Sequence, residues 1–217
     1  MKRHPARWCA CFVLLASASV EAKPIAFANG TTVMAEYGAG TMIEGQAFYA
    51  PAYWLSLGGG YVRFDSDITP RTREIAYLRA NYLVKRWNLP SAQANVFVWG
   101  GLGSANGNTF DGSRLARNVG AQADYETRRV YASLKSDLWE SHEFSQRVDT
   151  LQLGVAPYAH DYSTLATWFV VQARDYTGQI RHGVEWAALV RLFKGGAWVE
   201  AGLTDDGKPQ VMAMFNF

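Results

Sequence analysis

The C-terminal segment 211–217 is the feature that most constrains the fold of this 217-residue chain. Side chains of a β-strand alternate between two faces. Here one of these faces is wholly apolar, with Val211, Ala213, Phe215 and Phe217. A strand that ends on an aromatic residue in this way would be a sticky edge in water, where edges are normally blunted by charge or proline. The segment therefore predicts either an unprotected edge strand or a strand whose apolar face contacts lipid.

The N-terminus has the layout of a secretory signal peptide. Lys2, Arg3 and Arg7 precede an apolar run, 8–20, that is too short to span a membrane, and residues 20–22 form a plausible cleavage site. We expect residues 1–22 to be the signal peptide and residues 23–217 to be one mature domain. Both cysteines lie inside the first segment, not where a lipid-modified cysteine would follow it, so the mature chain is expected to carry neither a disulfide nor a lipid anchor.

Charge and hydropathy exclude two broad classes. The signal segment holds three of the 21 basic and one of the 19 acidic residues, so the mature chain carries equal numbers of each. Without a basic surface, a nucleic-acid partner is not expected. The mature chain has no apolar run of about 18 residues or more, which excludes a helical membrane protein.

The mature sequence repeats one pattern, a segment of alternating residues followed by a polar connection. We predict twelve strands, with ten as the alternative count because the first three segments alternate least regularly. The expected strands are 32–38, 43–50 (ended by Pro51), 54–64, 74–87, 95–103, 118–125, 128–139, 150–158, 167–175, 183–193, 197–203 and the C-terminal tail.

Charges within these segments fall on the parity opposite the apolar one. The twelve residues concerned are Glu36, Glu44, Arg79, Lys85, Asp124, Arg129, Lys135, Asp137, Arg174, Glu185, Arg191 and Glu200. The soluble alternative, with apolar residues inside and charges outside, gives the same alternation, so parity alone does not separate a soluble fold from a membrane one.

The connections and the aromatic residues favour the membrane interpretation. Connections near Pro51, Pro90, Glu126, Asp161 and Gly195 are short, whereas most of the others, such as 104–113 and 140–149, are longer and polar. We expect aromatic girdles at both rims. Near the short turns these are Tyr49, Trp54, Trp87, Tyr125, Tyr158, Phe193 and Phe217, and at the other rim Tyr37, Phe64, Trp139 and Tyr176.

On these residues the whole mature chain resembles the Gram-negative outer-membrane β-barrel class. The resemblance implies an all-β fold, a single antiparallel up-and-down transmembrane β-barrel in the outer membrane, with both mature termini in the periplasm. Outer-membrane lipid is the implied partner, together with the barrel-assembly machinery, for which Phe215 and Phe217 would form the recognition signal. The resemblance reaches no particular family, so it assigns no functional residues.

Our leading functional hypothesis is a narrow channel or small-solute uptake protein with a charged lumen, since twelve strands leave room for one. The solute itself is not predicted. The twelve charged residues are the lumen candidates, and Arg79, Lys85, Lys135, Arg174 and Arg191 are the first to test for anion preference. The alternative role of these charged residues is to form ion pairs that fill the lumen and brace the wall.

Two other functions remain open. A lipid-modifying enzyme needs a nucleophile and a histidine base, but His142, His160 and His182 have no recognisable Ser or Asn motif beside them. We therefore assign no catalytic residue, metal or cofactor, and residues 100–103 are interpreted as strand glycines, not as a phosphate loop. A non-conducting structural or partner-binding barrel is the third hypothesis, although segments such as 104–113 are short for adhesion.

Overall fold

The computed structural model describes residue 25 and residues 27–159 and 164–217. The predicted signal peptide and His160 lie outside these residues. No helix in the described part of the chain is long and apolar enough to cross a membrane.

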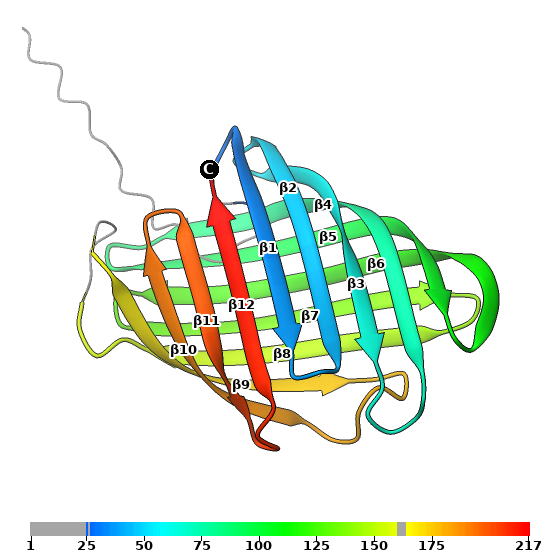
Figure 1. Cartoon of the computed structure of the whole chain (residues 1–217). Helices are drawn as coiled ribbons and strands as arrows, with labels where there is room; N and C mark the ends of the chain where they lie inside the picture. The colour runs from blue at the N-terminus through cyan, green and yellow to red at the C-terminus, as the bar shows by residue number, and fades with distance from the viewer. Residues whose placement is uncertain (1–24, 26, 160–163) are drawn as a thin grey trace, which may run out of the picture.

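Twelve β-strands make up the fold (Figure 1). They are β1 (Gly30–Gly38), β2 (Met42–Ala52), β3 (Leu55–Asp65), β4 (Thr72–Asn88), β5 (Ala92–Gly107), β6 (Phe110–Thr127), β7 (Val130–Ser141), β8 (Ser145–Val155), β9 (Ala166–Tyr176), β10 (Glu185–Lys194), β11 (Ala197–Thr204) and β12 (Pro209–Asn216). Each strand pairs antiparallel with the next, and β12 pairs with β1 to close the barrel. The predicted all-β, up-and-down, twelve-strand barrel is confirmed, and the ten-strand alternative is wrong.

The C-terminal segment makes the closure. Phe215 lies opposite Val33 and Val211 lies opposite Tyr37. Beyond the strand, the backbone N–H of Phe217 donates to the carbonyl of Thr31 at 2.9 Å, and the Thr31 N–H donates back at 2.6 Å. The end of the barrel that holds Gly30 and Phe217 is called the terminal end below, and the other is called the opposite end.

The outside of the barrel is apolar. In the C-terminal segment, Val211, Phe215 and Phe217 are exposed. Met212, Met214 and Asn216, which alternate with them, are buried inside. The same alternation runs through β10, where Trp186, Val190 and Leu192 face outward. Period-two alternation therefore assigns the two faces of these strands correctly.

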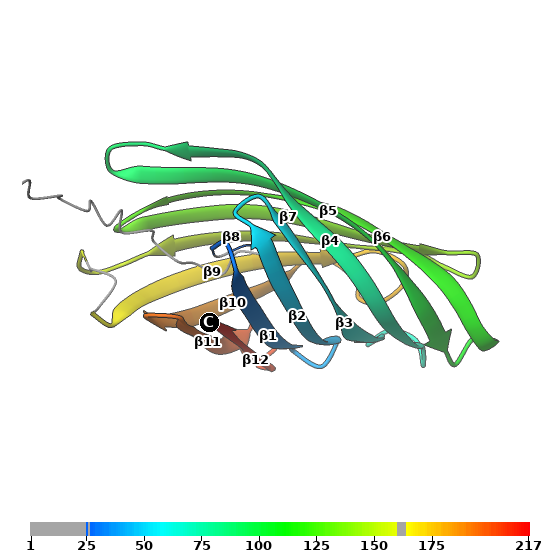
Figure 2. The ribbon, with the colours of Figure 1, turned by 90° about the horizontal axis from the view of Figure 1, so that it is seen from above.

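Strand lengths differ from the prediction. Segment 104–113 was expected to be a loop. It instead contains the end of β5, a short turn and the start of β6, with Ser104 paired to Leu115 and Gly107 to Phe110. Figure 2 shows the long strands β4, β5 and β6 side by side along one wall. Pairing continues through the glycine and polar residues of this segment, and Ala105 is fully buried in the apolar cluster at that end. Segment 140–149 is likewise mostly strand, with a connection of only residues 142–144.

Two predicted long connections are thus mostly strand, and the predicted alternation of short turns and long connections also fails at the terminal end. Ten residues, 156–165, separate β8 from β9 at the terminal end, where short turns were expected. Pro51 also does not end its strand, since β2 continues to Ala52 through a register shift between Tyr49 and Ala52. Proline is tolerated at such a bulge because its missing N–H is not needed for pairing.

The two predicted aromatic girdles are only partly made of the residues expected, although Tyr61 and Trp186 are also exposed toward the opposite end. Near the terminal end, Tyr49, Trp54, Trp87, Tyr125, Tyr158 and Phe217 are exposed. The prediction is wrong for Phe193, and at the opposite rim for Phe64, Trp139 and Tyr176, all of which are buried inside the barrel. They share the inward parity of their strands, and only Tyr37 of the second predicted girdle faces outward.

The interior is filled by apolar clusters at both ends. At the opposite end, Met42, Phe64, Trp139 and the loop residues Phe144 and Ile180 belong to one cluster. Toward the terminal end, one cluster includes Trp168, Phe193 and Trp198, and another includes Ile25, Leu83 and Phe97. Polar and charged residues occupy the space between these apolar regions.

Candidate functional site

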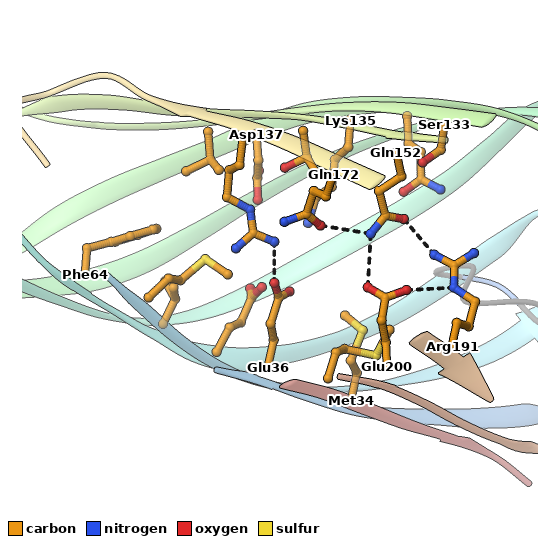
Figure 3. Close-up of a pocket in the computed structure, with 18 of the residues that line it drawn as sticks. Met34, Glu36, Phe64, Ser133, Lys135, Asp137, Gln152, Gln172, Arg191 and Glu200 are labelled. Atoms are coloured by element: carbon orange, nitrogen blue, oxygen red, sulfur yellow. Dashed lines mark hydrogen bonds and ion pairs between the residues drawn. The ribbon is translucent and has the colours of Figure 1, made fainter. Parts of the chain in front are cut away.

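The candidate site is a cavity of about 110 Å³ in the middle of the barrel, called the central cavity below. Figure 3 shows side chains from opposite walls pointing into it. Its lining contains amides, hydroxyls and methionines together with seven charged residues: Glu36, Glu44, Lys135, Asp137, Arg174, Arg191 and Glu200.

Two ion pairs line the cavity. Arg174 of β9 donates to the carboxylate of Glu36, across the interior from a strand that is not its neighbour. Arg191 and Glu200 lie directly opposite each other on β10 and β11, and the distance from Arg191 Nε to Glu200 Oε2 is 2.7 Å. All four side chains are nearly inaccessible to solvent, which makes these pairs costly to break.

Amide side chains connect the second pair to neighbouring strands. Gln152 Nε2 donates to Gln172 Oε1 at 2.9 Å and to Glu200 Oε1 at 3.1 Å, and Arg191 donates to Gln152 Oε1 at 2.8 Å (Figure 3). The Arg191 guanidinium also lies 4.4 Å from the ring centroid of Tyr131 and 4.3 Å from that of Trp198. Hydrogen bonds and cation–π contacts thus fix its position.

Asp137 is held by neutral donors. Its Oδ1 accepts hydrogen bonds from Trp99 Nε1 at 2.9 Å and from Asn118 Nδ2 at 2.7 Å. The nearest cation is Arg79, whose guanidinium nitrogen lies 3.7 Å from Oδ2. Arg79 in turn donates to Gln46 at 2.5 Å. The negative charge of Asp137 is therefore satisfied within the wall.

Glu44 and Lys135 are different, because neither has an ion-pair partner among the described residues. Glu44 Oε1 accepts a hydrogen bond from the Tyr77 hydroxyl at 2.6 Å. That hydroxyl fits there because residue 60 is glycine, where a Cβ would lie only 2.8 Å from it. The Lys135 ammonium lies 5.9 Å from the ring centroid of Trp99. Both residues line the central cavity.

Ten of the twelve predicted lumen residues are on the inward parity of their strands: Glu36, Glu44, Arg79, Asp124, Lys135, Asp137, Arg174, Glu185, Arg191 and Glu200. Of these, Arg79, Asp124 and Glu185 do not line the central cavity. Asp124 accepts from Asn95 at 2.6 Å toward the terminal end. Glu185 is fully buried near the opposite end, 3.6 Å from Arg181.

The lumen position predicted for Lys85 and Arg129 is wrong. A register shift between Leu83 and Lys85 pairs Lys85 with Val96, which turns Lys85 outward and gives the inward position to Arg86. Arg86 Nε donates to Asn95 Oδ1 at 2.7 Å. Arg129 lies in the turn between β6 and β7 and is exposed there, with its guanidinium donating to the carbonyls of Ala156 and Pro157.

Sequence reasoning missed the amides that line the cavity, Gln122, Gln152 and Gln172. They share the inward parity of the charged residues on their strands, so a search for all polar inward positions would have found them. It also missed Phe144 and Ile180, which enter the interior from loops. No periodic signal marks a loop residue as buried.

The loop between β9 and β10 closes the opposite end and is called the strap below (residues 177–184). Ile180, at its centre, is fully buried in the apolar cluster. The β3–β4 loop holds it, since the Asp67 N–H donates to the Ile180 carbonyl at 3.0 Å and Ser66 Oγ donates to the Gln179 carbonyl at 2.8 Å. Gln179 has a positive φ of 64°, a strained conformation for a side-chain-bearing residue.

Arg181 anchors the strap by charge. Its guanidinium lies 3.2 Å from Asp67, 3.3 Å from Asp206 and 3.6 Å from Asp205. Partial burial lowers the pKa of Arg181, but the hydrogen bond to Asp206 and the surrounding carboxylates outweigh it, so the pKa is raised. Hydrogen bonds from the Thr204 hydroxyl, Lys208 and Arg181 lower the pKa of Asp206. Both groups are therefore charged at neutral pH.

The two histidines that the structure describes, His142 and His182, provide no comparable site. The His142 side chain is exposed, with its Nδ1 3.4 Å from Glu143, and His182 is exposed on the strap. Within the part of the chain that the structure describes, no three His, Cys, Asp or Glu side chains are grouped to hold a metal ion.

Solved structures of other proteins resemble this chain, and two of them are described here. No protein-family model and no curated protein matches the chain. A structure described as a KdgM porin in complex with disordered oligogalacturonate matches 87% of this chain and 98% of its own, with 10% identity and a TM-score of 0.49. The match to a structure described as "Unveiling the Mechanism Behind the in-meso Crystallization of Membrane Proteins" covers 87% of this chain and 82% of that one, with 10% identity and a TM-score of 0.37. Neither likeness assigns a function to this chain.

Proposed function

We propose that this protein is an outer-membrane β-barrel that acts as a narrow, gated channel for small polar solutes, with its terminal end in the periplasm. The apolar outer wall supports the membrane location, because a closed barrel with a lipid-facing apolar surface and a polar interior is the form that spans this membrane. The exposed aromatic residues near the terminal end suit the headgroup region.

The observation that carries the proposal is the central cavity. If the interior only braced the wall, its charges would be paired throughout. Glu44 and Lys135 instead face the cavity without an ion-pair partner among the described residues. Beyond the Tyr77 hydrogen bond to Glu44 and the Trp99 ring beside Lys135, water or a solute would satisfy these charged groups. A second cavity of about 50 Å³ shares Met34, Gln122 and Lys135 with the first, and it continues the polar path toward the terminal end.

The opposite end supports gating. The side chains that close it include Ile180, which belongs to the strap and not to the barrel wall. A loop can leave a barrel mouth without disturbing the strand pairing, and loop movements of this kind control access in many proteins. The conformation described here is thus the closed state of the proposed channel.

A non-conducting structural barrel is the second candidate, and the filled interior favours it.

The channel predicts solute flux across a membrane, and the structural barrel predicts none. Liposomes that contain the purified, folded barrel should admit small polar solutes such as glycine and exclude a trisaccharide. Folding is verified by the different gel mobility of boiled and unboiled samples. If liposomes admit none of these solutes although the barrel is folded, the channel is excluded in favour of the structural barrel.

A further inference from the structure

Around the central cavity, one acid and one base of the described residues lie outside the ion pairs. Glu36 pairs with Arg174, Glu200 with Arg191, and Asp137 with Arg79. Among the described residues, Glu44 and Lys135 are in no ion pair, and both line the same cavity; Lys135 acts on Glu36 across the cavity without contacting it. Their charges have opposite sign, so a ligand that satisfies both must itself carry a positive and a negative group.

These two residues lie on nearly opposite walls. Around the closed barrel, β2 and β7 are five strands apart in one direction and seven in the other. Figure 3 shows Lys135 on the wall that faces Glu36, and Glu36 lies directly opposite Glu44 on the neighbouring strand. The ligand's two charges must therefore be separated along its length.

The wall around Glu44 favours a cation. Two carboxylates in directly opposed positions repel each other, and the hydrogen bond that Arg174 donates goes to Glu36 and not to Glu44. On the other side the apolar Val62 lies opposite Glu44, and the Tyr77 hydroxyl is a neutral donor to the carboxylate. An ammonium group beside Glu44 would supply the missing positive charge in this acidic part of the cavity.

The wall around Lys135 favours an anion. In register, Gln122 lies opposite Lys135 on β6 and Thr150 lies opposite it on β8. All three side chains line the cavity and can donate hydrogen bonds. An ammonium flanked by a hydroxyl and an amide is a suitable environment for a carboxylate.

We propose that the central cavity binds a small zwitterion, with its ammonium group at Glu44 and its carboxylate at Lys135. Amino acids with separated charges are the chemical class that fits. The cavity volume of about 110 Å³ far exceeds the space needed for one water molecule, so it has room for a short solute. This inference rests on the proposed function, since the solute enters through the channel.

Calorimetric titration of the purified, folded barrel tests it with three probes of matched size: 4-aminobutanoate, butanoate and butylammonium. Glycine and 6-aminohexanoate vary the charge separation. We expect at least one of the amino acids to bind, and butanoate and butylammonium to bind at least tenfold more weakly. If no amino acid binds to the wild type, or if butanoate or butylammonium binds as well as the best amino acid, the inference is overturned.

Two variants locate the contacts. Glu44→Gln and Lys135→Met should each weaken amino-acid binding at least tenfold, whereas Glu140→Gln and Lys194→Met, which alter exposed charges outside the cavity, should leave it unchanged. Full binding by both cavity variants overturns the assignment. If a cavity variant does not fold, the wild-type probe comparison still decides.

Conductance of the same samples separates the two proposals. An ion-conducting barrel that binds no amino acid refutes only the zwitterion site, and a non-conducting barrel that binds one refutes only the channel.

Discussion

Arg191 is the residue on which the central network depends most. It donates to both Glu200 and Gln152 and lies between two aromatic rings. Replacing it by methionine leaves the buried Glu200 carboxylate without its cation, a change that typically costs about 3–5 kcal/mol. Arg191→Met should therefore lower the free energy of unfolding in urea by about this amount.

The double variant Arg191→Met/Glu200→Gln provides the control, because it removes both charges together. It should recover a large part of the loss, since no uncompensated charge remains. Equal stability of the single and double variants would show that Arg191 acts through packing and not through the ion pair.

Phe217 is predicted to act in assembly and not in the lumen. Its deletion removes two backbone hydrogen bonds to Thr31 at the closing seam and an exposed aromatic ring at the terminal end. We expect a severalfold lower amount of protein in the outer membrane, measured by immunoblot of membrane fractions, with Phe217→Tyr near the wild-type amount. Normal levels of the deletion variant would contradict this role.

At the residue scale, parity in the sequence places most of the charged residues correctly and fails for identifiable reasons. Glu200 and Arg191 follow the alternation because their strands are regular. Lys85 does not, because a bulge inserts one residue and reverses the parity after it. No parity argument shows that Glu44 and Lys135 lie outside the ion pairs of the described residues, because ion pairing depends on which side chains meet across the barrel.

Among the elements, the strap combines a buried plug with a charged anchor. Arg181→Gln should free it, because the charge that binds Asp67 and Asp206 is lost. Hydrogen exchange followed by mass spectrometry should then be at least tenfold faster in segments 66–71 and 177–184, with the strands unchanged. Arg71→Gln, an arginine of the same end that has no ion pair within the described residues, is the matched control. Unchanged exchange in Arg181→Gln would refute the anchor.

The strap should also resist mild acid. The pKa of Asp206 lies below the ordinary value of 3.8 because Thr204, Lys208 and Arg181 donate hydrogen bonds to its carboxylate. A lowered pKa means that the contribution of Asp206 is complete above pH 3.8 and is lost only as the pH falls through the lower folded-state pKa. In the Glu185→Gln variant, which removes the other carboxyl group that faces Arg181 at 3.6 Å, hydrogen exchange of the strap, corrected for its intrinsic pH dependence, should be the same at pH 8 and pH 5. Loosening within this range would assign the anchor to another group.

The elements also show what sequence patterns leave out. Alternation identifies all twelve strands, but it places their ends too early where glycine, serine and asparagine continue the pairing, as in segment 104–113. The burial of Ile180 could not be predicted, because a loop has no fixed side-chain period and its position depends on contacts with distant loops.

For the whole molecule, closure of the barrel follows from the sequence and the state of its interior does not. The apolar face of the tail requires a partner strand, and pairing of Val33 with Phe215 supplies it. Whether twelve strands enclose an open or a filled lumen depends on the size of the inward side chains and on the loops that enter it. Here Trp139, Trp168 and Trp198 fill much of that space.

Single-channel conductance in planar bilayers tests the central claim most directly, with the wild type and Arg181→Gln compared after folding has been verified by gel mobility. The channel account predicts brief, small openings in the wild type and sustained ion current in Arg181→Gln, because loss of the anchor lets Ile180 leave the mouth. Absence of current from both folded proteins would contradict the account and identify the barrel as structural.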